Sequence, residues 1–185
     1  EDYMIENRQF DEEGTYYGLP FNKSTEILIY NKKFFDEFEL TVPKTWAEVE
    51  AVAIQILDIV HSGQADDLYD GFVLSDFIKT NPFVPFAWDS TSNFFITTTR
   101  QWGGVYTESV DLETGTLRFD NAQTRTALTF LQGLANYERT SGTKTPLVQV
   151  PEYWEKNYAS DPFKAVQTVM TVGSSAGIYH NVGGR

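Results

Sequence analysis

The chain has 185 residues, a formal net charge of −12, 41% hydrophobic and 15% aromatic residues, and no cysteine. This length predicts about one domain, which buries roughly 70% of the surface that the unfolded chain exposes. The acidic charge disfavours nucleic acids and anionic lipid surfaces as partners. The absence of cysteine excludes disulfides, thiolate metal sites and cysteine nucleophiles.

The first third of the sequence predicts a strand and two helices. Glu26–Tyr30 is rich in β-forming residues and predicts a strand, and Phe34–Phe38 predicts a short helix. Thr45 and Glu48 form a capping box, which begins a helix with apolar residues at helical spacing. We expect that helix to end near Gly63.

The middle of the sequence is less regular. Asp70–Leu74 predicts a turn followed by a strand, and residues 81–88, which include two prolines, predict a loop. Phe94–Trp102 predicts a helix that stops at the following pair of glycines. Leu112–Phe119 predicts a small hairpin around Thr114 and Gly115.

The last third predicts a long helix and a buried strand. We expect Asp120 to cap a helix that runs to about Tyr137, with Ala127, Leu128, Leu131 and Leu134 on one side. Residues 146–160 predict a loop, 163–167 one helical turn, and 169–172 a buried strand. Because strands and helices alternate, the sequence predicts an α/β fold.

Gly173–Gly177 matches the G-x-S-x-G pattern of a hydrolase nucleophile elbow. Such a serine needs a histidine base, normally far downstream. His61 lies upstream, and His180 lies only five residues after Ser175, so neither fits. Alternatively, small residues after a strand let a ligand approach a helix N-terminus, or the glycines only form a tight turn.

Other patterns give weaker signals. The stretch 66–71 resembles a calcium loop but lacks two of the required ligands, so it predicts a solvated acidic turn. No histidine pair has zinc-ligand spacing, and we expect neither a metal nor a cofactor. Carboxylates are too numerous to single out a glycosidase pair. Trp88 is a candidate for stacking on a sugar ring, while most other aromatics are expected in the core.

Several segments together resemble the second lobe of the extracellular solute-binding proteins of ABC importers. The likeness is to the carbohydrate-type group that includes the maltose- and glycerol-3-phosphate-binding proteins. The segments that carry it, in the family's order and spacing, are Gly18–Thr25, Leu28–Lys32, Pro43–Glu48, Trp102–Gly104, Leu117–Asn121 and Phe163–Gly177. Val166 departs from the pattern, since the family usually has glycine there.

The resemblance implies a type II periplasmic-binding-protein fold, with two α/β lobes that each hold a mixed sheet flanked by helices. Residues 1–17 would be an N-terminal segment near the hinge, and 18–185 most of the C-terminal lobe. The chain would be an internal piece whose N-terminal lobe is missing. It would capture a sugar or sugar-derived solute outside the cytoplasm, in the periplasm or as a cell-surface lipoprotein. Hinge closure would present the unchanged solute to an ABC importer permease.

The resemblance also implies ligand-binding residues. Ser24 matches a position that faces the ligand, with Asn22 and Thr25 beside it. Ser174 and Ser175 match a small-residue turn that opens toward the cleft. The remaining three candidates lie where family members carry a stacking aromatic, with Trp88 fitting only if the loop shifts: Trp88, Ser90 and Asn93.

Two other functions stay open at the level of sequence. The chain could belong to a serine hydrolase using Ser175 or to another carbohydrate-active hydrolase. It could also be an adhesion or signalling module built on the same fold. For the solute-binding reading, we expect this lobe alone to bind weakly or not at all, because it supplies half the contacts.

Overall fold

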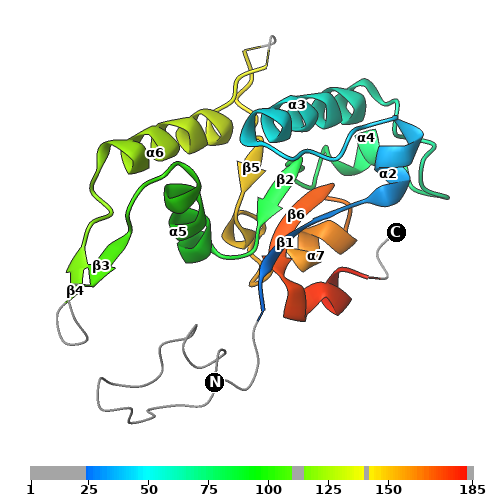
Figure 1. The fold of residues 1–185 in the computed structure, drawn as a ribbon. Helices are drawn as coiled ribbons and strands as arrows, with labels where there is room; N and C mark the ends of the chain where they lie inside the picture. Colours follow the sequence, from blue (N-terminus) through cyan, green and yellow to red (C-terminus); the bar gives the residue numbers. More distant parts are fainter. Residues whose placement is uncertain (1–23, 110–114, 140–141, 183–185) are drawn as a thin grey trace.

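A computed structural model describes residues 24–109, 115–139 and 142–182. Four strands form one mixed sheet in the order β1–β6–β2–β5 (Figure 1). Strand β6 pairs antiparallel with β1 and parallel with β2, and β2 pairs parallel with β5. The strands are β1 Glu26–Tyr30, β2 Phe86–Trp88, β5 Val148–Gln149 and β6 Met170–Ser174.

The strand directions bring three chain segments to the same end of the sheet, where β2 and β6 end and β1 begins. We call this end the sheet edge. Glu26, the first residue of β1, pairs with Ser174, the last residue of β6. Trp88, the last residue of β2, pairs with Val172. The chain that enters β1 therefore lies beside the chain that leaves β2 and β6, and this edge holds the candidate site.

Helices cover the sheet, and a separate hairpin, which lies between α5 and α6 in the chain, projects from the body (Figure 1). The α-helices are α2 Lys32–Glu37, α3 Trp46–Ser62, α4 Leu74–Phe77, α5 Thr91–Gln101, α6 Ala122–Ala135 and α7 Ser160–Lys164. Two 3₁₀ helices, η1 Pro151–Trp154 and η2 Ser175–Asn181, and the hairpin strands β3 Thr107–Ser109 and β4 Gly115–Leu117 complete the fold. The predicted α/β class and mixed sheet are confirmed. No described helix has the length and apolarity needed to span a membrane.

Helix α3 forms as the sequence predicts. The Thr45 hydroxyl accepts a hydrogen bond from the Glu48 amide at 3.3 Å, and the Glu48 carboxylate accepts from the Thr45 amide at 3.3 Å. Gly63 ends the helix in the left-handed conformation, with φ 79°. The buried face includes Ile56 and Leu57, whose full burial contributes about 1.5–3 kcal/mol each.

Two predictions in the middle of the chain are wrong. Leu74 begins helix α4 rather than completing a strand. Asp66 explains why, since its carboxylate accepts hydrogen bonds from the amide and hydroxyl of Ser75 at 2.7 and 2.6 Å, which anchors the first turn of α4. The predicted loop 81–88 ends in strand β2, whose three residues are all buried. A short, fully buried parallel strand shows no alternation that a sequence pattern could reveal.

The second half differs in its details. The segment 146–160 contains β5 and η1, and the helical turn expected at 163–167 begins earlier, as α7. The hairpin pairs residues 107–109 with 115–117, so Gly115 lies in a strand and Thr114 lies outside the described residues. Leu128 is 44% exposed, although its spacing placed it on the apolar side of α6.

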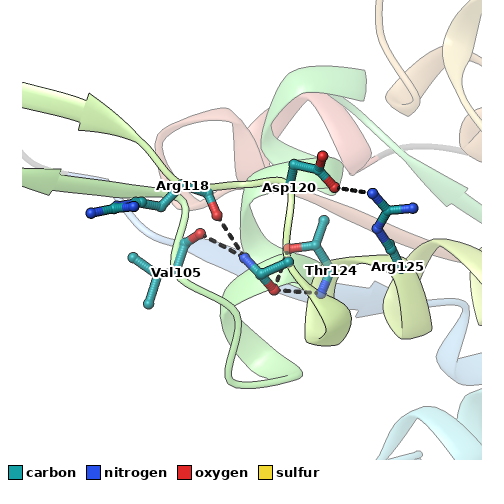
Figure 2. A network of polar contacts seen from close by, with 6 residues as sticks. Val105, Arg118, Asp120, Thr124 and Arg125 are labelled. Atoms are coloured by element: carbon teal, nitrogen blue, oxygen red, sulfur yellow. Dashed lines mark hydrogen bonds and ion pairs between the residues drawn. The ribbon is translucent and has the colours of Figure 1, made fainter.

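Asn121, not Asp120, caps helix α6, and the helix ends at Ala135 rather than near Tyr137. The Asn121 side chain accepts from the Thr124 amide at 2.9 Å and donates to the Arg118 carbonyl at 2.7 Å. Asp120 instead forms an exposed ion pair with Arg125 at 2.6 Å (Figure 2). The amide side chain is preferred as the cap because it both accepts and donates at the helix start.

Candidate functional site

Thr25 and Ser175 join the start of β1 to the start of η2. The Ser175 amide donates to the Thr25 carbonyl at 2.8 Å, and the Thr25 amide donates to Ser175 Oγ at 3.1 Å. These bonds extend the β1–β6 pairing by one residue beyond the ladder. The sheet edge is therefore held by the residues that the sequence singled out.

The two serines of the G-x-S-x-G segment have structural partners. Ser174 Oγ accepts from the Ala176 amide at 3.2 Å and caps η2, while Ser175 Oγ accepts from Thr25. In the described part of the chain, neither histidine hydrogen-bonds to either serine. Among the described residues, neither serine therefore has a histidine in place as the general base that a serine nucleophile requires.

A cavity of about 480 Å³ lies between β6, α7 and η2, and we call it the β6 cavity. Its volume falls in the range of about 300–1,000 Å³ that is usual for small-molecule sites. The polar side chains that line it include Asp89, Lys164, Thr171, Ser174, His180 and Asn181. It lies at the carboxyl end of β6, which is where open α/β sheets commonly bind ligands.

Two residues that line the β6 cavity each have a buried polar atom with no hydrogen-bond partner among the described residues. The atoms are Thr171 Oγ1 and Asn181 Oδ1. Thr171 is only 1% exposed. A buried polar atom left unpaired costs about 1–3 kcal/mol. A solute that bonded to these atoms would recover that free energy on binding.

Asp89 also contributes to the cavity, and sequence reasoning missed it. Its amide donates to the Val172 carbonyl at 2.9 Å, and its Oδ1 accepts from the Ala159 amide at 2.6 Å, which ties the end of β2 to the start of α7. Its second oxygen, Oδ2, has no hydrogen-bond partner among the described residues. An aspartate directly after a strand is a recognisable signal, but it required strand β2 to be predicted.

Gly173 leaves room in the cavity. A Cβ at this position would meet the Asp89 side chain at 3.7–3.9 Å, an ordinary van der Waals contact. Thr171 and Gly173 point to the same face of β6, because side chains alternate along a strand. Because glycine has no side chain, no atom of residue 173 beyond the backbone lies between Asp89 and the cavity.

A second cavity, of about 500 Å³, is bordered by β1, β2, α3 and α5, and we call it the tryptophan cavity. Trp88 lines it but is only 4% exposed. The Trp88 ring stacks on Phe94 with 4.5 Å between centroids, and its Nε1–H donates to Glu26 Oε1 at 3.0 Å. Trp88 thus lies in strand β2 and packs in the core. The prediction that it lies in a loop is wrong.

The other sequence candidates are scattered. Ser90 caps α5, where its Oγ accepts from the Asn93 amide at 3.3 Å, and Asn93 itself is exposed. Neither lines the two cavities. Ser24 is exposed at the sheet edge, and Asn22 lies outside the described residues. Only Ser174 of the predicted residues lines the β6 cavity, with Thr25 and Ser175 next to it.

The described residues contain no cluster of three or more histidines, cysteines and carboxylates that could hold a metal ion. In the cavity wall, Lys164 lies 3.7 Å from Asp161. The lining offers hydroxyl, amide, carboxylate, ammonium and imidazole groups, and no described serine of the cavity hydrogen-bonds to a histidine. It is suited to binding a polar solute by hydrogen bonds.

Comparisons with known proteins identify a family and a similar fold. A family model described as "Bacterial extracellular solute-binding protein" matches residues 6–182. Among similar solved structures is the ABC substrate-binding protein Lmo0181 from Listeria monocytogenes in complex with cycloalternan, with a TM-score of 0.58 and 18% identity. The match covers 94% of this chain but 41% of the Listeria chain. No curated protein sequence matches.

Proposed function

Because the chain belongs to the family of bacterial extracellular solute-binding proteins, we propose that it captures a sugar or sugar-derived solute at the β6 cavity. The family points to a non-enzymatic binding protein that works outside the cytoplasm. In this proposal the solute is passed, chemically unchanged, to the permease of an ABC importer. The carbohydrate bound by the Listeria protein of similar fold supports this class of solute.

The observation that carries the proposal is the pair of unsatisfied atoms, Thr171 Oγ1 and Asn181 Oδ1. Native proteins pair nearly all buried polar groups, so exceptions call for an explanation. Two such atoms on residues that line one cavity fit a solute with several hydroxyl groups, since a hydroxyl both donates and accepts. The serine-hydrolase interpretation has no corresponding support, because no histidine hydrogen-bonds to Ser175 among the described residues.

We further propose that the β6 cavity forms one wall of a larger site. The chain spans 41% of the length of the Listeria protein that it resembles. In this proposal residues 18–185 form most of the C-terminal lobe, and residues 1–17 lie near a hinge. Ser24, Thr25, Ser174 and Ser175 would then form the rim that meets a second lobe, and closure of the two lobes would complete the binding site.

Protein-observed NMR with the uniformly ¹⁵N-labelled full chain tests the proposal. Cycloalternan, titrated to millimolar concentration, is expected to shift the backbone amides of Gly173 and Gly177, both in the β6 cavity. The indole N–H of Trp88 reports on the tryptophan cavity and should not move. Saturable shifts at Trp88 alone would place binding elsewhere, and the absence of shifts with cycloalternan, maltotetraose and glucose would contradict solute capture at the β6 cavity of this chain.

A further inference from the structure

We propose that Asp89 makes the β6 cavity select solutes that donate hydrogen bonds and reject anionic ones. This inference rests on the proposed function and deepens it by naming the class of solute. It assigns to Asp89 a role in specificity, beyond its structural bond to α7. The selected groups are the hydroxyls of a neutral sugar or the ammonium of an amino sugar.

The first argument is the charge in the cavity lining. Lys164 and Asp161 lie 3.7 Å apart, so they largely balance each other. Asp89 forms no ion pair in the described part of the chain, and His180, which also lines the cavity, is exposed. One carboxylate therefore remains uncompensated at the cavity wall. A solute carboxylate or phosphate placed there would meet like charge, which is costly in a partly desolvated site.

The second argument is the kind of hydrogen bond that is left over. An ionised carboxylate only accepts, and Asp89 Oδ1 is already used by the Ala159 amide at 2.6 Å. Asp89 Oδ2 and Asn181 Oδ1 are two acceptors of the cavity residues that have no hydrogen-bond partner among the described residues. Thr171 can donate or accept. These unpaired groups mainly accept hydrogen bonds, so they favour solute groups that donate. A carboxylate or phosphate of the solute does not donate.

The third argument is access. The Gly173 position brings Asp89 to the cavity without an intervening side chain, as a Cβ there would already lie 3.9 Å from Asp89 Oδ2. The contact between Oδ2 and a solute therefore needs no rearrangement of β6. The Asp89 amide donates to the Val172 carbonyl and the Asp89 carboxylate accepts from the Ala159 amide, and these two bonds hold the carboxylate in place.

The test compares four solutes of the same ring on the ¹⁵N-labelled full chain, namely glucose, glucosamine, glucuronate and glucose 6-phosphate. Shifts of the Gly173 and Gly177 amides give the affinities. We expect glucose and glucosamine to bind at least about tenfold more tightly than the two anions. Tighter binding of glucosamine than glucose would identify an ammonium as the preferred donor, and equal binding would identify a hydroxyl.

The variant Asp89→Asn sharpens the test. Asparagine keeps an oxygen to accept from the Ala159 amide, so the link to α7 is retained, and it replaces the second oxygen with a donor. We expect the preference for neutral over anionic solutes to shrink by about tenfold. The control Asp76→Asn makes the same change in net charge on α4, where Asp76 pairs with Lys79 outside the cavity, and should leave the preference unchanged.

The outcomes separate the two proposals. If cycloalternan, maltotetraose and glucose all leave the cavity amides unshifted, the proposed function fails and this inference with it. If glucose binds but glucuronate binds equally well, only the inference is overturned. The same holds if Asp76→Asn relaxes the preference as much as Asp89→Asn does, because the effect would then come from overall charge.

Discussion

The sheet separates two cavities that are similar in size but differ in whether the polar atoms of their lining residues have hydrogen-bond partners. The tryptophan cavity, of about 500 Å³, lies on the face of β6 that carries Val172. The β6 cavity, of about 480 Å³, lies on the face that carries Thr171 and Gly173. Since neighbouring side chains on a strand point to opposite faces, one short strand contributes to both.

The cavities differ most in how their polar atoms are satisfied. In the tryptophan cavity, Glu26 accepts from Trp88 Nε1 at 3.0 Å and from the Thr97 hydroxyl at 2.7 Å, and Trp46 Nε1 donates to Gln101 at 2.7 Å. In the β6 cavity, Thr171 Oγ1 and Asn181 Oδ1 have no partner among the described residues. Unsatisfied polar atoms therefore mark the candidate site better than aromatic rings do.

The largest expected effect concerns the tryptophan cavity. Trp88→Ala should lower the free energy of unfolding by about 3–5 kcal/mol, because it removes a buried ring that packs on Trp46, Phe86 and Phe94. Urea denaturation followed by circular dichroism measures the loss. The variant Trp88→Phe keeps a ring and should retain sugar binding. If a well-folded Trp88→Phe protein bound no sugar, the stacking interpretation of Trp88 would be restored.

Trp88 also shows where sequence reasoning reaches its limit. The helix from the Thr45 capping box and the strand from Glu26 were predictable, because local hydrogen bonds and hydrophobic spacing specify them. Strand β2 was not, since its three buried residues follow two prolines and form pairs only with distant strands. Trp88 was therefore assigned to a loop and to ligand stacking.

The candidate site was predictable only in part, for the same reason. Ser174 and Ser175 follow a strand with a clear apolar pattern, so their place at a sheet edge could be expected. Asp89 owes its position to β2, and Thr171 and Asn181 become notable only when hydrogen-bond partners are counted across the fold. No spacing in the sequence reports that a buried oxygen lacks a partner.

The next effect concerns the volume of the β6 cavity. Gly173→Ala adds one methyl group at 3.7 Å from Asp89, a distance that needs no shift of the backbone. We expect solute affinity to fall by about tenfold or more, with little change in stability, because the methyl group occupies space at the Asp89 wall. Titration of glucose or cycloalternan, read at the Gly177 amide, measures the affinity.

A matched control for Gly173→Ala is Gly133→Ala in α6. A Cβ at Gly133 meets nothing within 4 Å, so this change should raise stability by about 0.5–1 kcal/mol and leave solute affinity as it is. Unchanged affinity in Gly173→Ala would mean that the solute does not use the space beside Asp89. The β6 cavity would then have no more claim to solute binding than the tryptophan cavity has.

The smallest expected effect is the most direct test of the unsatisfied atoms. Thr99 Oγ1, in α5, is buried and unpaired like Thr171 Oγ1, but Thr99 lines neither cavity. Thr171→Val and Thr99→Val each replace a buried hydroxyl with a methyl group of similar size. Both should raise the free energy of unfolding by about 1 kcal/mol, because no unpaired hydroxyl then has to be buried.

The two valine variants should differ in binding. If Thr171 is kept for the solute, Thr171→Val gains stability and loses affinity by about tenfold, whereas Thr99→Val gains stability alone. Urea denaturation and glucose titration on the same samples separate the two quantities. Equal affinity in both variants would mean that the Thr171 hydroxyl, like that of Thr99, is buried without a role in solute binding. A loss confined to Thr171→Val would show that this hydroxyl costs the free protein stability in exchange for its bond to the solute.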